Sequence, residues 1–493
     1  MNWADKFRNI TQLGGATLLA TAMTMLEGVI AARVLGPAVL GAWFTFQIVL
    51  RYGGRLHFGV PNAFRRQLSV DRGAKNESQI GELADVVATF LVVVIIVQVA
   101  IVGGMAIWPG FSSEIRVIAL FGIVIIASQT AKSFVHPFNN GLGNFEENAL
   151  LKLVGAASSV VTIGLTIQFS LVGFLFGRVL REVAQFGIGF YRIGYIPSFS
   201  LDTGRLRRLL RIGFLIMLVS FSSQVFKTVD RLMIIWYFPS KSLGFYGTGD
   251  TFATLLLTVS SVVTNVLYTS FSEKYGADLS SEQFKSELLG TVKVISYFFP
   301  IVFVNIYVFV PLVIQIVLPE YPASVPVARA LAFGYIFFAG ATVVGSVLNS
   351  FKKQRLYILV IAIGITVNAA LNYAAIQLGG ELIGIGIATA GTYFVFFLLL
   401  FGVVIAFFDG SVRLFGRVTV QLLVPALFAL GYALLVSDYV AVRDSAISLD
   451  TVWTAVVLFA AVMPLSVSFG VLTLREADIN LSQVHGKVTQ WAS

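Results

Sequence analysis

Residues 24–66 read TMLEGVIAARVLGPAVLGAWFTFQIVLRYGGRLHFGVPNAFRR. The short break Leu35-Gly36-Pro37 joins two long apolar segments here, and each is long enough to cross a bilayer as an α-helix. Ionisable side chains nevertheless fall where lipid is expected: Glu27 in the first segment, Arg51 and Arg55 in the second. A charge at the bilayer centre costs about 2.5–3.5 kcal/mol on insertion scales, so each of these residues is a candidate functional residue.

The composition predicts a polytopic α-helical membrane protein. Of the 493 residues, 57% are hydrophobic and 12% are charged, and apolar runs recur from Ile10 to Val471. The chain has no cysteine, which excludes disulfides and thiol catalysis. Its histidines are few, so we expect no metal site and no cofactor. The net charge of +9 needs no nucleic acid as partner, because loop cations that set topology account for most of it. No cleaved signal peptide is expected, since the first apolar run is part of an internal repeat.

Fourteen membrane helices are predicted from the apolar runs, with approximate ends. They are 10–34, 38–62, 80–108, 115–138, 148–170, 172–194, 211–238, 242–270, 286–318, 322–350, 355–378, 381–408, 416–436 and 451–473.

Basic residues gather in loops on one side of the predicted membrane. These loops contain Arg65, Arg66, Arg72 and Lys75; Arg192, Arg205, Arg207, Arg208 and Arg211; Lys352, Lys353 and Arg355; and Arg413 and Arg417. By the positive-inside rule, these loops and both termini are expected to be cytoplasmic, in the plasma or inner membrane. The cluster at 205–211 is explained either as a topology anchor or as an amphipathic segment on an anionic leaflet.

An internal repeat relates the two halves of the chain. At an offset of 203 residues, Glu27 falls on Asp230, Leu40-Gly41 on Leu243-Gly244, and Trp43 on Tyr246. The predicted domains are therefore an N-lobe of helices 1–6 (1–194), a cytoplasmic linker (195–210), a C-lobe of helices 7–12 (211–408), and helices 13–14 with a tail (409–493). Because each repeat has an even number of helices, we expect the lobes to be related by a two-fold axis along the membrane normal.

Polar side chains form stripes on several predicted helices. Such stripes must face a protein interior or a watery cavity, because lipid cannot satisfy them. The predicted central cavity is lined by Arg51, Arg55, Asn62, Arg178, Arg181, Lys227, Arg231, Asp250, Thr254, Thr258 and Asn265. The acids Glu27, Asp230 and Glu182 are expected either to pair with nearby cations or to couple transport to an ion.

Arg51 and Arg55 differ from the other buried charges. They lie one turn apart in mid-helix, next to Gly53-Gly54, and have no acidic neighbour on their own helix. Glu27 could neutralise one of them, but a bound phosphate accounts for both. For other charges a structural pairing is the simpler interpretation: Arg178 with Glu182 at i,i+4, and Asp230 with Arg231 or Lys227. Lys132, Lys152 and Lys293 are expected to snorkel.

The runs Ala32-Arg33-Val34-Leu35-Gly36-Pro37, Phe64-Arg65-Arg66 and Val229-Asp230-Arg231-Leu232-Met233-Ile234 resemble those of polysaccharide-biosynthesis flippases. These proteins belong to the multidrug/oligosaccharidyl-lipid/polysaccharide exporter superfamily. The resemblance covers essentially the whole chain. It implies a transporter, not an enzyme, that moves a polyprenyl-(pyro)phosphate-linked oligosaccharide to the outer leaflet by alternating access.

The resemblance also implies a cavity whose cations are Arg51, Arg55, Arg178, Arg181, Lys227 and Arg231. The expected partners are the lipid-linked oligosaccharide and membrane lipids, with glycan-assembly enzymes as a further option, and the protein is expected to be a monomer. Three alternatives stay open: a multidrug exporter, a peptidoglycan-precursor flippase, and, from another class, a membrane glycan polymerase or ligase. A drug exporter should have an acidic, aromatic cavity, and an enzyme needs a larger external loop than Val436–Asp450.

Overall fold

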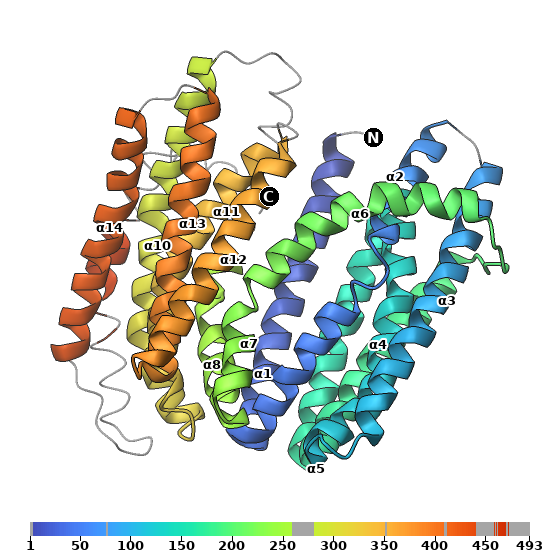
Figure 1. Cartoon of the computed structure of the whole chain (residues 1–493), viewed down its shortest axis with the longest axis horizontal. Helices are drawn as coiled ribbons and strands as arrows, with labels where there is room; N and C mark the ends of the chain where they lie inside the picture. The colour runs from blue at the N-terminus through green and yellow to red at the C-terminus, as the bar shows by residue number, and fades with distance from the viewer. Residues whose placement is uncertain are drawn as a thin grey trace, which may run out of the picture. The chain divides into compact units, whose positions relative to one another are not determined.

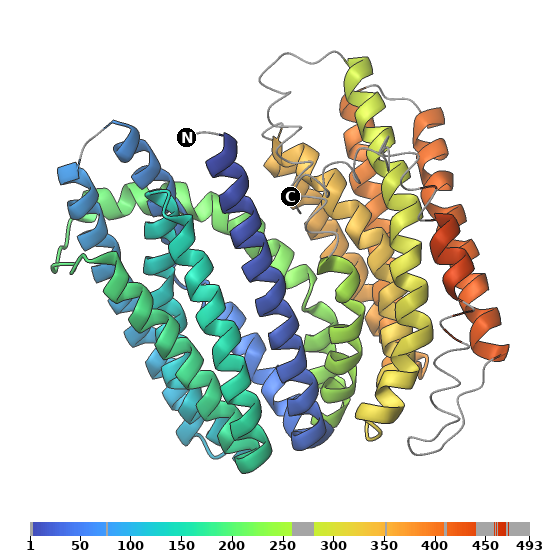
Figure 2. The same ribbon diagram turned by 180° about the vertical axis from the view of Figure 1, so that it is seen from behind.

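The computed structural model describes residues 3–74, 77–258, 281–350, 353–408, 412–439 and 462–469, with the single positions 458, 460 and 472 (Figures 1 and 2). Among these residues, ten helices are long and apolar enough to cross a membrane. Two of them, α1 (Trp3–Gly53) and α5 (Phe145–Ile193), contain a non-helical residue, so each supplies two of the predicted spans. The predicted helix 451–473 and the end of 242–270 fall mostly outside the described ranges. The predicted all-α membrane fold is confirmed.

The described chain divides into two compact units. One unit takes in Met1–Gln224 with Phe238–Gly244, and the other takes in Val225–Tyr237 with Phe245–Ser493. The first contains α1, α5 and the helices α2 (Val60–Gly73), α3 (Glu77–Ile107), α4 (Ser113–Gly141) and most of α6 (Thr203–Phe226). The second contains α7 (Val229–Tyr237), most of α8 (Ser240–Ala253), α10 (Ser281–Val317), α11 (Ser324–Ser350), α12 (Gln354–Gln377), α13 (Glu381–Phe408) and α14 (Val412–Tyr439).

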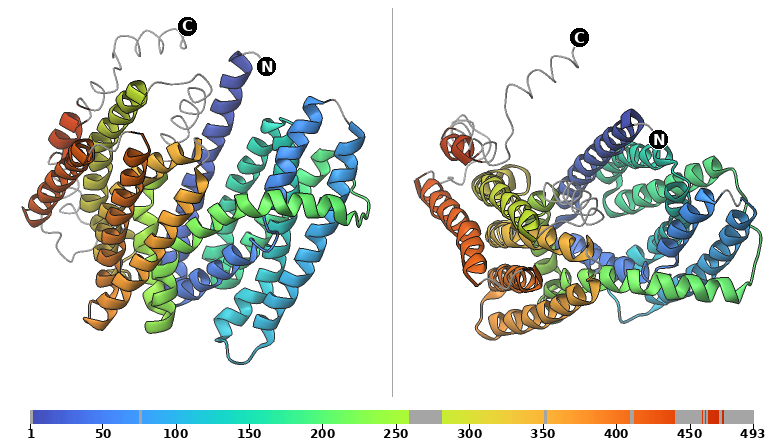
Figure 3. Two further views of the ribbon diagram at one scale, coloured as in Figure 1. Left: turned by 45° about the horizontal axis from the view of Figure 1, so that its top comes forward. Right: turned by 90° about the horizontal axis from the view of Figure 1, so that it is seen from above.

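Helix α5 is a helical hairpin. The backbone turns at Ser170, where φ is 52°, between the predicted helices 148–170 and 172–194. Beyond the turn, Gly177 contacts Thr162 and Gly189 contacts Leu151, so the two halves run antiparallel. Glycine at these positions lets the two backbones approach closely, because a side chain would meet the facing residue. The hairpin packs against α1 and α4 (Figures 1 and 3).

Two predicted helices are broken in the structure, and both boundaries were therefore wrong. The helix expected at 38–62 ends at Gly53 and resumes at Val60 as α2. The helix expected at 211–238 begins earlier, at Thr203, and stops at Phe226. Asp202 explains the early start, since its carboxylate accepts a hydrogen bond from the Arg205 amide at 2.9 Å and so caps the helix. Residues 203–210 of the predicted linker are consequently helical.

The turns that the repeat pairs in sequence also meet in space, within the first unit. A side-chain carbon on Gly41 would meet the Ser240 carbonyl, and one on Gly244 would meet the Pro37 carbonyl. Adding 203 to 37 and 41 gives 240 and 244, so each repeat contributes the same pair of positions. This reciprocal contact is what a two-fold relation between the repeated turns produces. The glycines of the two Leu-Gly motifs are thus required for close backbone contact.

Candidate functional site

The break in α1–α2 creates the centre of the site. Residues 54–59 form tight turns, with the Leu56 amide bonded to the Gly53 carbonyl and the Val60 amide bonded to the His57 carbonyl, each at 3.0 Å. Phe58 and Gly59 have φ of 48° and 77°. Glycine adopts a positive φ without strain, so Gly59 favours the break at this point.

Neighbouring side chains satisfy the polar groups that the break exposes. Gln98 of α3 donates to the Gly53 carbonyl at 2.8 Å and accepts from the Thr130 hydroxyl at 2.7 Å. The amide of Gly59 donates to Nδ1 of His57 at 3.1 Å, so this ring nitrogen is unprotonated. The break is consequently a fixed element of the structure and not an unsatisfied gap.

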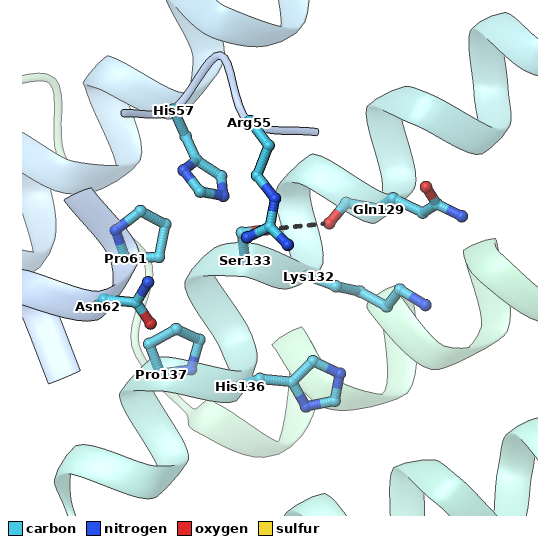
Figure 4. Close-up of a pocket in the computed structure, with 9 residues that line it drawn as sticks. All are labelled: Arg55, His57, Pro61, Asn62, Gln129, Lys132, Ser133, His136 and Pro137. Carbon is cyan, nitrogen blue, oxygen red and sulfur yellow. Dashed lines mark hydrogen bonds between the residues drawn. The ribbon is translucent and has the colours of Figure 1, made fainter. Parts of the chain in front are cut away.

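Two adjoining cavities of about 330 and 220 Å³ open beside the break. They share Arg55, Gln129 and Ser133. The larger is also lined by His57, Pro61, Asn62, Lys132, His136 and Pro137 (Figure 4), and the smaller by Arg51, Gly54, Thr130 and Gln224. Among the described residues that line these cavities, none is acidic. The structure thus brings together three of the predicted site residues, Arg51, Arg55 and Asn62, in a cationic pocket of the first unit.

Helix α4 supplies the wall opposite the arginines. Figure 4 shows Arg55 directed toward Gln129 and Ser133, whose hydroxyl bonds the Gln129 carbonyl at 3.3 Å. Pro137 lacks the amide that would bond the Ser133 carbonyl in a regular helix, which leaves an extra acceptor in this wall. On the side of α6, the Ser220 hydroxyl accepts from Arg55 Nη1 at 3.3 Å. Arg55 is therefore held between α4 and α6 by neutral groups, and no acid among the described residues forms an ion pair with it.

Glu27 is enclosed by two arginines of α5. Its carboxylate lies 2.6 Å from Arg178 Nε and 3.1 Å from Arg181 Nη1, and its side chain is fully buried. Arg178 also lies over the rings of Trp43 and Phe174. The cluster ties α1 to α5. It also corrects one expectation, since Arg178 pairs with Glu27 and not with Glu182.

Glu182 pairs instead with Lys132. The Lys132 ammonium contacts the Glu182 carboxylate and donates to Gln185 Oε1 at 2.6 Å. Lys132 was expected to snorkel, and this expectation was wrong because a buried acid on α5 lies within its reach. Since Lys132 also lines the larger cavity, this cation belongs both to the pocket wall and to the α4–α5 contact.

In the second unit, the acids are engaged in a buried network. Asp250 contacts the Arg231 guanidinium and accepts from the Tyr335 hydroxyl. Asp230 accepts from the Tyr246 hydroxyl and, at 2.8 Å, from the backbone amide of Arg231. The guanidinium of Arg231 therefore pairs with Asp250 and not with Asp230, which was the expected partner. Both carboxylates are buried and hydrogen-bonded, as a stable interior requires.

The remaining predicted site residues belong to the second unit. Lys227 is exposed and its Nζ lies 5.1 Å from the centre of the Phe338 ring. The Thr254 hydroxyl donates to the Thr251 carbonyl at 2.8 Å, and the Thr258 hydroxyl to the Thr254 carbonyl at 3.4 Å. Asn265 lies outside the described residues. Their roles in substrate binding stay predictions.

Most of the α4 wall was not predicted from the sequence. Gln129, Ser133 and His136 line the pocket together with Lys132, yet none of them was among the residues predicted to line the cavity. A signal was present: positions 129, 132, 133 and 136 are spaced by three and four, which places them on one helical face.

The comparisons with known proteins agree with the residue-based resemblance. A profile of the family described as polysaccharide biosynthesis protein matches residues 83–326. The predicted resemblance is confirmed. Among curated proteins, no match to the sequence is found.

Solved structures with the same fold are transporters and flippases. A lipid II flippase, MurJ, in an inward closed conformation is similar with a TM-score of 0.69 and 14% identity, covering 94% of this chain and 99% of that chain. An inward-facing multidrug resistance MATE family transporter of the MOP superfamily has a TM-score of 0.65 and 14% identity, over 84% and 98%. A MOP superfamily transporter from Pyrococcus furiosus, described as having a binding pocket of reverse polarity, has a TM-score of 0.55 and 16% identity, over 81% and 96%. At these identities the similarity shows the fold.

Proposed function

We propose that this protein is a flippase for a polyprenyl-(pyro)phosphate-linked oligosaccharide. The observation that supports this most strongly is the pocket at the α1–α2 break, which is lined by Arg51 and Arg55 together with neutral hydroxyl and amide groups. A pyrophosphate is a concentrated anion that arginine binds through paired, charge-assisted hydrogen bonds. The larger cavity, at about 330 Å³, falls at the small end of the range of ligand sites, which suits a head group.

The polar wall of α4 suits the sugar part of such a substrate. Gln129, Ser133, His136 and Asn62 offer both donors and acceptors, as recognition of sugar hydroxyls requires. The polyprenyl tail needs no protein site, because it can stay in the lipid. In this proposal the pocket holds and releases the head group during transport, and no catalytic step is needed.

The alternatives differ in what the pocket should contain. A drug exporter for organic cations needs acidic groups, and the described lining of both cavities has none. A lipid II flippase would need the same phosphate-binding cations, so its head group is the second candidate, supported by the similarity to the fold of MurJ. The choice between the two glycans depends on the sugars and not on the arginines.

The proposal is tested by flipping assays in proteoliposomes. The substrate is a fluorescent polyprenyl-pyrophosphate oligosaccharide, and the readout is the fraction of label that an impermeant quencher can reach over time. We expect Arg51→Gln with Arg55→Gln to slow flipping by about 100-fold, because each lost charge-assisted hydrogen bond contributes about 1.5 kcal/mol or more. Flipping at the wild-type rate by a folded double variant would refute the anion site.

A matched control removes the same charge elsewhere in the first unit. Arg65→Gln with Arg66→Gln alters two exposed arginines of α2 that line neither cavity. This variant should flip the substrate as the wild type does. Lipid II and a fluorescent organic cation, tested in the same vesicles, then separate the glycan flippase from its two alternatives.

A further inference from the structure

An extended strap, residues 194–202, lies along the first turns of α3. The Tyr195 hydroxyl donates to the Asp85 carboxylate at 2.7 Å, and the Ser200 amide donates to the Thr89 hydroxyl at 3.0 Å. Strap and helix therefore advance in the same direction and stay in contact over several residues. The apolar side chains of the strap are left on the outside: Ile196, Phe199 and Leu201 are 83%, 78% and 69% exposed.

The start of α6 lies near the depth of the lipid head groups. Helix α3 has 31 residues, which gives a length of about 46 Å at 1.5 Å per residue. A bilayer measures about 40–45 Å with its head groups and about 30 Å without them. A helix of this length that is centred in the bilayer extends about 8 Å, or about five residues, beyond the hydrocarbon at each end. Gly81 and Glu82, which contact Tyr195 and Arg205, fall at the inner edge of this interfacial layer, and Thr89 lies deeper.

One exposed face of α6, the helix that follows the strap, is basic in its first turns and apolar in the next turn. Arg207, Arg208 and Arg211 are exposed and lie within about 100° of one another, opposite the buried Leu209. The same exposed face continues one turn later as Phe214 and Leu215. Arg205 is used within the unit, where it pairs with Glu82 and Asp202; in the described part of the chain the other three arginines form no ion pair.

Helix α6 lies at the rim of the first unit. Figures 1 and 3 show it running across this unit, at a steep angle to α3 and α4 and along the outer edge when viewed from above. Its buried face meets α2 and α3, with Leu209 in the same apolar core as Phe64 and Val87. Arg208 also lines a small cavity with Gln67 and Asp71 of α2, and all three arginines are exposed at the surface of this unit, where membrane lipid can reach them.

We propose that the strap and the first turns of α6 bind the head groups of anionic phospholipids. Guanidinium groups bind lipid phosphates through charge-assisted hydrogen bonds. Each cation near an anionic leaflet strengthens binding to that leaflet by roughly fivefold. The adjoining Phe199, Leu201, Phe214 and Leu215 require hydrocarbon beside those phosphates. A soluble polyanion could satisfy the arginines but would leave the apolar side chains in water, so the combination selects a lipid surface.

The surface also contacts the wall of the pocket. Beyond the arginines, α6 meets the break at Gly59 through Gly213, and its Ser220 binds Arg55. Lipid held at the outer end of α6 would therefore fix the helix that positions Arg55. This connection is separate from the identity of the transported substrate, and the site can be tested without any transport assay.

The test measures lipid selectivity of the whole purified protein. Native mass spectrometry with equal amounts of phosphatidylglycerol and phosphatidylcholine should show preferential retention of phosphatidylglycerol by the wild type. In the triple variant Arg207→Gln, Arg208→Gln, Arg211→Gln, the ratio of bound phosphatidylglycerol to bound phosphatidylcholine should fall at least about tenfold. A triple variant with lysine at the same positions should keep most of it, which separates loss of charge from loss of fold.

A matched control and a competitor complete the experiment. Arg355→Gln, Arg413→Gln and Arg417→Gln remove the same charge from exposed positions on the side predicted to be cytoplasmic, and should leave the preference unchanged. Equal losses in the two glutamine triples, or an unchanged preference in the α6 triple, would overturn the proposal. Displacement of phosphatidylglycerol by inorganic pyrophosphate would also overturn it, since the arginines would then belong to a site for the substrate head group.

Discussion

Replacing Glu27 by glutamine tests whether the acid that the sequence places in lipid is a structural counter-ion. In the folded protein its oxygens lie 2.6 and 3.1 Å from Arg178 and Arg181, and its side chain is fully buried. At an effective dielectric constant of about 20, unit charges at these distances attract by about 5–6 kcal/mol each. The cost of desolvating the three charges offsets much of this attraction. Removing the acid alone leaves two buried cations facing each other, and such changes cost about 3–5 kcal/mol.

Unfolding of purified protein in mixed detergent micelles, titrated with sodium dodecyl sulfate, would measure that cost. We expect Glu27→Gln to lower the free energy of unfolding by about 3–5 kcal/mol. Adding Arg178→Gln to Glu27→Gln should restore part of the loss, because one of the unpaired cations is then gone. The control Glu320→Gln removes an exposed acid and should change stability by no more than about 0.5 kcal/mol.

One result would refute the structural role of Glu27. If Glu27→Gln unfolds within about 1 kcal/mol of the wild type but no longer transports, the carboxylate is not needed to hold α1 against α5. Its charge would then have a role in the transport cycle, such as the coupling to an ion that the sequence also allows. A loss of stability together with recovery in the double variant would instead assign Glu27 to the scaffold.

Two further predictions concern the glycine contact and the strap. Gly41→Ala should destabilise the protein by about 1–3 kcal/mol in the same unfolding assay, because the added carbon meets the Ser240 carbonyl. The control Gly28→Ala should not destabilise it, since there is open space around Gly28. Equal losses of stability in the two variants would contradict the close contact at Gly41. Burial and the hydrogen bond to Asp85 raise the pKa of Tyr195 to about 12. Because the folded-state pKa is raised, the stabilisation is complete below about pH 10 and is lost as the pH rises toward 12. Tyr195→Phe should therefore lose less stability than the wild type over that interval, and an identical decline in both proteins would argue against this hydrogen bond.

The pocket shows which parts of the site could be predicted. The pair Arg51 and Arg55 was identified because a charge in an apolar run is costly and therefore conspicuous. Gly53-Gly54 lies between them, where glycine lowers the cost of leaving the helix, yet one helix over 38–62 was predicted. Gln129, Ser133 and His136 were not identified, because uncharged polar residues cost little free energy in a membrane helix and are common there. Their shared helical face becomes informative only when it is known to lie beside the arginines.

The pairing of the charges could not be predicted in the same way. Local spacing favours Arg178 with Glu182, since side chains four residues apart on a helix can meet. The structure pairs Arg178 with Glu27, which is distant in sequence, and Glu182 with Lys132 of another helix. In a low-dielectric interior the partner is decided by which charges the packing brings within reach, and spacing along one helix does not contain that information.

The sequence by itself determined that this chain is an all-α membrane protein and that its two halves repeat the same elements, and it predicts that Arg51 and Arg55 bind an anion. Those conclusions depend on hydrophobicity, periodicity and the cost of charge in lipid, which are properties of each segment alone. Only the tertiary structure decided which cations are neutralised and which face a cavity. That outcome depends on the approach of α1, α4, α5 and α6. A buried cation is a structural tie where a carboxylate meets it, as at Arg178, and a candidate binding group where neutral side chains surround it, as at Arg55.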